Sequence, residues 1–141
     1  MAIKEQATNQ IVINALESQV IDTDTTTTGA IIDTADYDNG IYFAMSASAY
    51  TDGTYTLKIE DGDDSGLSDA ADIPAAQLVY GTLPALAAAL AEGVALSKEG
   101  IFGNKRYVRA SIVSTDTDTG ATVEVLAIVN PEISATPQAS L

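Results

Sequence analysis

The densest group of possible metal ligands is the acidic stretch DGDDSGLSDAAD, residues 61–72. Six of its residues fall on positions 1, 3, 5, 6, 9 and 12 of the calcium loop of EF-hand proteins: Asp61, Asp63, Ser65, Gly66, Asp69 and Asp72. Against calcium, position 12 is Asp instead of the longer bidentate Glu, and an expected strand precedes the loop instead of a helix. Asp, Ser and Gly also favour turns. We therefore expect a solvated acidic turn and no metal site.

A second pair of carboxylates lies in TDTDTG, where Asp116 and Asp118 are two positions apart. Two carboxylates are the minimum for acid–base hydrolysis, but nothing apolar surrounds these two to raise a pKa. The chain has no His and no Cys, which excludes Ser-His-Asp and Cys-His sites, thiolate metal sites and disulfides. The sequence also lacks a Gly-rich phosphate loop. We expect no catalytic residues, no cofactor and no enzyme activity.

Basic residues cluster in GNKRYVRASI, which holds three of the six Lys and Arg of a chain with 20 acids and a net charge of −14. In a strand, Lys105, Tyr107 and Arg109 share one face and Arg106 starts the other. A solvated sheet face is one interpretation, because long side chains cover apolar neighbours. The other is a contact surface, because Tyr and Arg are enriched at interfaces and cations complement the acidic loops of another copy. We predict a protein interface at Lys105, Arg106, Tyr107 and Arg109.

Composition limits the class of protein. The length of 141 residues suits a single domain, and a hydrophobic fraction of 46% argues against a disordered chain. No apolar run approaches the roughly 20 residues of a membrane span, and MAIKEQATNQ has no secretory signal pattern. The net negative charge would repel nucleic acid and anionic lipid. We expect a soluble acidic domain with no nucleic-acid or membrane partner.

The elements that position these residues follow from a two-residue period. GIYFAMSASAY and YTLKIE alternate on either side of TDGT, and we predict a hairpin turning at Asp52-Gly53. KRYVRASIVS and ATVEVLAIV alternate in the same way around TDTDTG, which predicts a second hairpin. QIVINA and TTTTGAII indicate two further strands, because β-branched residues favour extended backbone.

One segment departs from this period. LPALAAALAEG places Pro84 at a possible first helical turn, spaces its leucines as a helix does and ends at Gly93, which predicts a short helix. The expected fold is all-β and mainly antiparallel, a β-sandwich or small barrel with one short helix and extended termini. The expected organisation is an N-terminal arm over 1–9, a single β-sandwich domain over 10–129 and an extended C-terminal tail over 130–141, with both ends ordered mainly by neighbouring chains.

Three stretches together resemble a family of small structural proteins of tailed bacteriophage heads. They are TDGTYTLK (51–58), the acidic residues 60–64 and GIFGNKRYVR (100–109), and the resemblance extends from Gly40 to Val129. Leu67 stands where the family often has an aromatic residue, and Phe102 lies one place later than the usual aromatic. Members are taken to be capsid decoration (cement) or minor head proteins. The resemblance implies a β-rich virion protein without catalytic activity, assembled in the host cytoplasm.

Two functions remain open at this point. The first is a structural virion protein on the capsid surface that binds the major capsid protein in the assembled lattice, as a homo-oligomer with a trimer favoured. The second is a β-sandwich binding module of a phage tail or cell surface that recognises carbohydrate or another receptor through exposed aromatic residues. The candidates for that role are Tyr42, Tyr50 and Tyr80.

Overall fold

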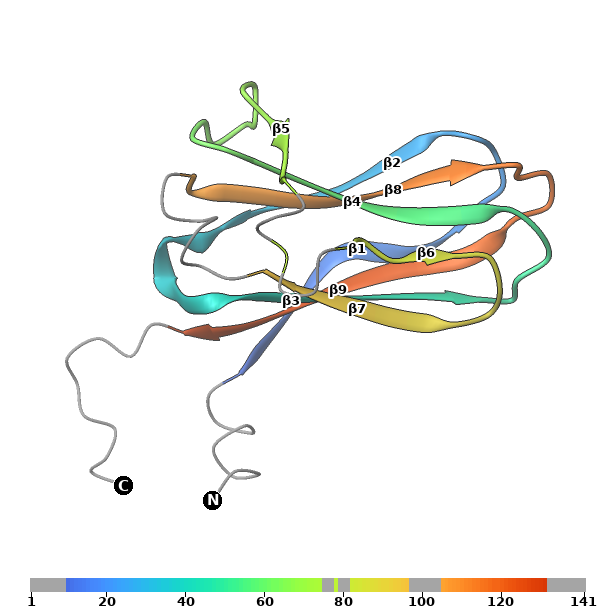
Figure 1. Cartoon of the computed structure of the whole chain (residues 1–141), viewed down its shortest axis with the longest axis horizontal. Helices are drawn as coiled ribbons and strands as arrows, with labels where there is room; N and C mark the ends of the chain where they lie inside the picture. Colours follow the sequence, from blue (N-terminus) through green and yellow to red (C-terminus); the bar gives the residue numbers. More distant parts are fainter. Residues whose placement is uncertain (1–9, 75–77, 79–81, 97–104, 132–141) are drawn as a thin grey trace, which may run out of the picture.

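The computed structural model describes residues 10–74, 78, 82–96 and 105–131. Two antiparallel β-sheets pack face to face (Figure 1). Within these residues there is no α-helix, and the helical structure is limited to a 3-10 turn, η1, at Thr34–Asp36. The expected antiparallel β-sandwich is confirmed.

The two sheets, A and B, have four and five strands, respectively. Sheet A has the order β1-β9-β3-β7, with β1 at Ile11–Ile21, β9 at Ala121–Pro131, β3 at Tyr37–Ser48 and β7 at Ala91–Leu96. Sheet B has the order β2-β8-β4-β5, with β2 at Thr26–Asp33, β8 at Tyr107–Thr115, β4 at Thr54–Gly62 and β5 at Ala71–Asp72. The short strand β6, Ala85–Leu86, also pairs with β4.

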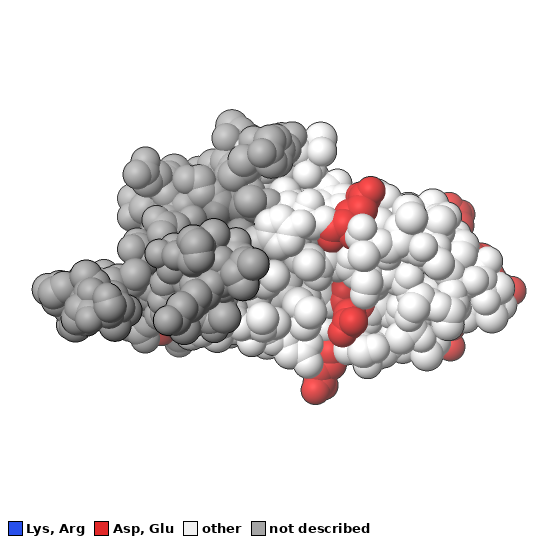
Figure 2. All heavy atoms as spheres, turned by 90° about the horizontal axis from the view of Figure 1, so that it is seen from below, with Lys and Arg blue, Asp and Glu red and all other residues white. Residues whose placement is uncertain are grey.

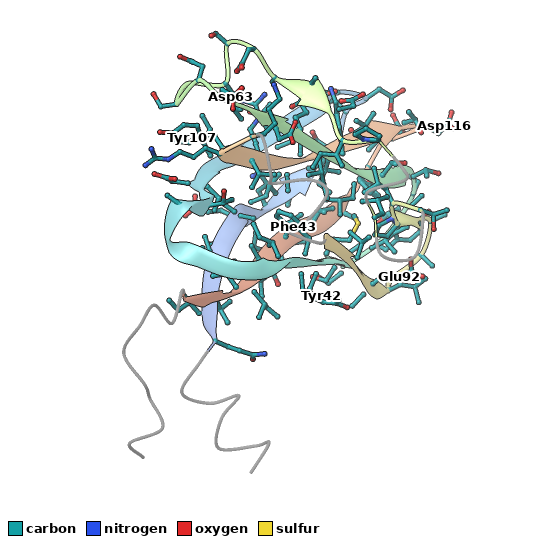
Figure 3. All side chains as sticks on the ribbon, turned by 60° about the vertical axis from the view of Figure 1, so that its left-hand side comes forward. Tyr42, Phe43, Asp63, Glu92, Tyr107 and Asp116 are labelled. Atoms are coloured by element: carbon teal, nitrogen blue, oxygen red, sulfur yellow. The ribbon has the colours of Figure 1, made fainter. Side chains whose placement is uncertain are left out.

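The core lies between the two sheets, and alternate residues of β3, β4, β8 and β9 reach it. On β3, Phe43 is fully buried, whereas its neighbour Tyr42 lies on the opposite side of the strand (Figure 3). Further fully buried side chains come from β4, β6, β8 and β9: Tyr55, Leu57, Ile59, Leu86, Val108, Ile112, Val123, Val125 and Val129. Burying one Val, Leu, Ile or Phe side chain contributes about 1.5–3 kcal/mol, so this layer holds the sheets together.

The two predicted hairpins are wrong. β3 lies in sheet A and β4 in sheet B, and the connection from β8 to β9 crosses between the sheets in the opposite direction. The connection from β1 to β2 crosses as well, so all three are arches that join facing strands. Alternating strands on either side of an Asp-Gly or Asp-Thr turn are common to hairpins and arches, because each puts one face of both strands into a core. The sequence pattern therefore cannot distinguish them.

One carboxylate joins two of these arches. The carboxylate of Asp52, in the β3–β4 arch, accepts hydrogen bonds from the backbone N–H groups of Asp118, Thr119 and Gly120 in the β8–β9 arch, at 2.9–3.2 Å. These bonds lower the pKa of the Asp52 carboxyl, because they stabilise its ionised form. The Tyr55 hydroxyl donates to the Asp52 carbonyl oxygen at 2.8 Å. Asp52, on which the prediction of a hairpin turn was based, thus connects the two arches by hydrogen bonds.

Both arches also use the left-handed backbone region twice, at positions four residues apart. The φ angles are 47° at Ala49 and 97° at Gly53, and 56° at Asp116 and 94° at Gly120. A Cβ on Gly120 would overlap the backbone carbonyl oxygen of Ile21 in the first arch. Glycine is therefore required at position 120 for both conformation and space.

The predicted short helix at residues 83–93 is also wrong, since this segment contains β6 and the start of β7. Leu86 is fully buried and pairs with Tyr55, and the Pro84 carbonyl oxygen accepts a hydrogen bond from Leu57 at 3.0 Å. Gly93, read as a helix stop, lies within β7 opposite Ala44. Pairing with β4 and β3 outweighs the helical propensity of the alanine-rich sequence, which is a weak effect.

Candidate interaction surfaces

The structure places the predicted basic interface on sheet B. Lys105 and Arg106 directly precede β8, while Tyr107 and Arg109 lie in its first three residues, between β2 and β4. Each of the three cations lies against a carboxylate of the same chain. The pairs are Lys105–Asp63 at 3.3 Å, Arg106–Asp33 at 2.7 Å and Arg109–Glu60 at 3.0 Å. A contact of these residues with a partner protein stays a prediction.

The Arg106–Asp33 pair is bidentate. Nε and Nη2 of Arg106 each donate to a different carboxylate oxygen of Asp33 at 2.7 Å. The hydrogen bond from Arg106 is the main reason why the pKa of the Asp33 carboxyl lies below its usual value. The guanidinium also lies 5.2 Å from the centre of the Tyr107 ring, within cation–π range. Arg106 is therefore held against its own sheet by a carboxylate and a ring.

The Arg109–Glu60 pair lies at the centre of sheet B. The two residues are directly opposite in the β4–β8 register, and their side chains are 21% and 13% exposed. Burial alone would raise the pKa of Glu60, but the hydrogen bond from Arg109 and the charge of Lys58 outweigh it and lower that pKa. Lys58 lies 3.4 Å from Glu60 and 3.8 Å from Asp72. Arg109, expected at an exposed strand position, is instead a mostly buried member of an ion-pair network.

The acidic stretch 61–72 is a turn that leads from β4 to β5. The carboxylate of Asp64 accepts backbone N–H groups of Gly66 and Ser68, and that of Asp69 accepts those of Asp63 and Asp64, at 2.9–3.2 Å. The Lys105 ammonium lies beside Asp63, where it neutralises part of the acidic charge. Among the residues that the structure describes, no group of three or more His, Cys, Asp or Glu side chains is arranged to hold a metal ion.

The remaining candidates from the sequence do not form a common site. Asp116 and Asp118 are exposed on the β8–β9 arch, at the end of the sandwich away from Tyr107 (Figure 3). The Tyr50 hydroxyl donates to the Gly53 carbonyl oxygen at 2.8 Å, and its ring packs edge-on against Tyr55, so Tyr50 belongs to the β3–β4 arch. Tyr42 is exposed on sheet A, and Tyr80 lies outside the described residues.

Sequence reasoning missed the outer face of sheet A. In register across β1, β9 and β3, one row consists of Val12, Ile128 and Tyr42, and the next of Asn14, Leu126 and Ala44. Val12 is 60% exposed and Tyr42 is 44% exposed. The signal lay in VLAIV, residues 125–129, where apolar residues occupy both faces of one strand. Such a strand has an apolar outer face in addition to its core face.

Acidic residues cross the middle of this face. The next row places Glu124 of β9 opposite Ser46 of β3, whose hydroxyl donates to the carboxylate at 3.4 Å. Figure 2 views the molecule from this side and shows a band of acidic side chains between neutral surfaces, with no basic side chain in view among the residues that the structure describes. None of the four strands of sheet A contains Lys or Arg. The face thus combines apolar and acidic groups without internal cations.

Comparison with known proteins shows similarity in structure alone, since no family model and no curated protein sequence matches the chain. The crystal structure of the SPBc2 prophage-derived protein YomS aligns over 86% of this chain and 92% of its own, with 12% identity and a TM-score of 0.49. A chain of the infectious bursal disease virus structure, Gx strain, aligns over 91% of this chain and 34% of its own, with 10% identity and a TM-score of 0.53. The crystal structure of PirA aligns over 84% and 94%, with 9% identity and a TM-score of 0.43.

At such low identities these similarities concern the fold. Of the three, the chain from infectious bursal disease virus has a TM-score above 0.5, and it contains this kind of β-sandwich as about a third of its length. In the described part of our chain, no helix has the length and hydropathy required to cross a bilayer. The similarity to the chain from infectious bursal disease virus agrees with the two-sheet architecture that the strand pairing defines.

Proposed function

We propose that this chain is a structural protein of a bacteriophage virion that binds the assembled capsid and stabilises it by protein–protein contacts. Its partner would be the major capsid protein on the capsid surface, and the chain would act as a homo-oligomer, with a trimer favoured. The sequence resemblance to phage head proteins supports this proposal. The β-sandwich, a fold that also occurs within a chain of the infectious bursal disease virus structure, is consistent with it.

The observation that carries the proposal is the outer face of sheet A. Val12, Tyr42, Leu126 and Ile128 lie side by side on the outside of regular, paired strands, where they do not contribute to the core between the sheets. Exposed apolar groups gathered on one face mark sites of protein contact, whereas single exposed apolar residues need no explanation. A sheet face of this kind suits a broad contact with another protein surface.

A capsid presents the same surface many times, which matters for a small protein. If each copy in an oligomer contacts a different capsid subunit, the second and third contacts form at high effective concentration, and overall affinity rises without new types of contact. Each bound oligomer would then connect neighbouring subunits. Stabilisation follows by mass action, because the protein binds the assembled lattice and not the separated subunits.

The test is co-sedimentation of the purified chain with heads of the encoding phage that were assembled without it. We expect saturable binding to these heads and no binding to unassembled major capsid protein at the same subunit concentration. Heads with bound chain should also lose their DNA at a higher temperature than bare heads. Heads already saturated with the chain serve as the control. Equal binding to unassembled subunits, or absence of binding to heads, would contradict the proposal.

A further inference from the structure

We infer that the outer face of sheet A is the docking face, and that the partner surface presents Lys or Arg side chains around an apolar centre. This inference rests on the proposed function and specifies its contact. The face is built from three strands in register, so its side chains are fixed relative to one another: Val12, Asn14, Tyr42, Ala44, Leu126 and Ile128. Five of these six side chains are apolar or aromatic, with Asn14 as the polar member, and Val12 and Tyr42 are well exposed to a partner.

The charge of the face defines the chemistry of its partner. Glu124 lies next to the apolar rows, and β1 adds the exposed residue Glu17. Glu92 of β7 is exposed as well, but it is opposite the buried Met45 and therefore lies on the core side of that edge strand. No cation from any strand of sheet A compensates these carboxylates. A partner with Lys or Arg at matching positions would gain attraction and faster association, whereas an acidic partner would be repelled.

A second copy of the chain does not fit this requirement as well. Two copies that meet through the same face would bring the acidic band of one near that of the other. If the face contacted sheet B of a second copy, the cations there would already be paired within their own chain. The pairs are Lys58–Glu60, Lys105–Asp63, Arg106–Asp33 and Arg109–Glu60. A different protein with unpaired cations is the better complement.

Tyr42 provides an anchor within the apolar rows. Its ring extends over Gly93 of the neighbouring strand β7, because a Cβ at that position would overlap the ring and its hydroxyl. The ring is therefore already seated on the sheet while 44% of the residue stays exposed. A pre-positioned aromatic side chain loses little conformational freedom on binding, and tyrosine is among the residues that contribute most at interfaces.

The experiment compares two charge reversals in the head-binding assay. Glu124→Lys changes the face of sheet A, and Asp72→Lys makes the same change of charge on the exposed edge strand β5 of sheet B. We expect Glu124→Lys to raise the Kd at least tenfold and Asp72→Lys to change it less than threefold. Tyr42→Ala should also raise the Kd at least tenfold, which tests the apolar centre separately. A thermal melt of each variant confirms that it is folded.

The outcomes separate the inference from the function on which it rests. Binding of the wild-type chain with loss in Glu124→Lys and Tyr42→Ala supports the docking face. If Glu124→Lys and Tyr42→Ala bind heads as tightly as the wild-type chain does, the outer face of sheet A is not the docking face. The same holds if Asp72→Lys alone loses binding. In both cases the proposed capsid function is retained. If the wild-type chain does not bind heads, the proposed function falls and this inference falls with it.

Discussion

The two outer faces of the sandwich differ in how they handle charge. On sheet B, each of the four cations that the structure describes lies within 3.8 Å of a carboxylate of the same chain. On sheet A, the strands contribute carboxylates and exposed apolar groups but no cation. Among the residues that the structure describes, charge is therefore distributed unevenly between the two outer faces.

This difference changes the meaning of a charge cluster in a sequence. The run from Lys105 to Arg109 is conspicuous because its neighbours in the chain are not acidic. Its neighbours in space are, since β2 and the end of β4 supply Asp33, Glu60 and Asp63. A cluster of cations on an acidic chain can thus mark where the protein balances its own charge. The face with unbalanced groups has no conspicuous motif.

The largest effect is expected when alanine substitutions of two outer-face glutamates are compared for their loss of stability. The two residues are Glu60 on sheet B and Glu124 on sheet A. Glu60→Ala removes the partner of the mostly buried Arg109 guanidinium. The Nε atom of Arg109 is buried and has no hydrogen-bond partner even in the wild-type chain. Leaving such a charged group unsatisfied costs about 1–3 kcal/mol, so the melting temperature should fall by several degrees. Glu124→Ala should change stability by less than about 0.5 kcal/mol. Calorimetry of both variants checks the difference, and equal losses would remove the contrast between the faces.

A smaller effect is expected from the pH dependence of the Arg106–Asp33 pair. The pKa of Asp33 is lowered in the folded state, so the pair stabilises the fold above the unfolded pKa of about 3.9, and this contribution is lost as the pH falls through the folded pKa. Both side chains are about half exposed, and screening limits the contribution to about 1 kcal/mol or less.

The measurement for this pair is the melting temperature of the wild-type chain and of Arg106→Gln between pH 7 and pH 2.5. The wild-type chain should melt higher at pH 7, and the gap should narrow below about pH 4 as Asp33 becomes protonated. The loss of the contact with Tyr107 does not depend on pH and provides an internal baseline. A gap that is constant over the whole range would show that Asp33 is not the relevant partner.

The smallest effect on stability is expected from Gly93→Ala on sheet A. The added methyl group would displace the Tyr42 ring, which is a flexible side chain and can rotate away. Stability should change by less than about 0.5 kcal/mol, as is usual for surface positions. The ring resonances of Tyr42 should shift in an NMR spectrum, and binding to heads should weaken because the anchor is no longer pre-positioned. Unchanged resonances would mean that Gly93 does not seat the ring.

The sequence predicts the strands and the sandwich well but not the connections. Alternation in β3, β4, β8 and β9 follows from the core face of each strand, which sequence alone reveals. Whether consecutive strands share a sheet depends on how the chain rotates at residues 49–53 and 116–120, and both arrangements bury the same side chains. The helix predicted at residues 83–93 is wrong for a related reason, because contacts with distant strands determine the structure of this segment.

The candidate surfaces show the same limit. The cations of the basic run are visible in the sequence, but their carboxylate partners lie 42 to 73 residues away. The outer face of sheet A consists of ordinary residues such as Val12, Leu126 and Ile128, which become a surface through the register of three strands. The apolar residues on both sides of β9 were the one local indication.

The arches have a consequence for how this chain folds during its synthesis. Consecutive long strands lie in different sheets, so β1 pairs with β9 and β2 pairs with β8, across most of the chain. Proteins dominated by such distant pairings fold slowly, in milliseconds to seconds. The chain loses the entropy of closing long loops before the strand contacts lower its free energy.

During synthesis on the ribosome, the pairing of β1 with β9 is delayed further. Ile21 ends β1 and Ala121 begins β9, and the residues between them take roughly 5–20 s to synthesise at about 5–20 residues per second. During that time β1 lacks its partner strand and exposes its backbone groups to other nascent chains. Release of the final strand from the ribosome is therefore the step at which folding begins to compete with aggregation.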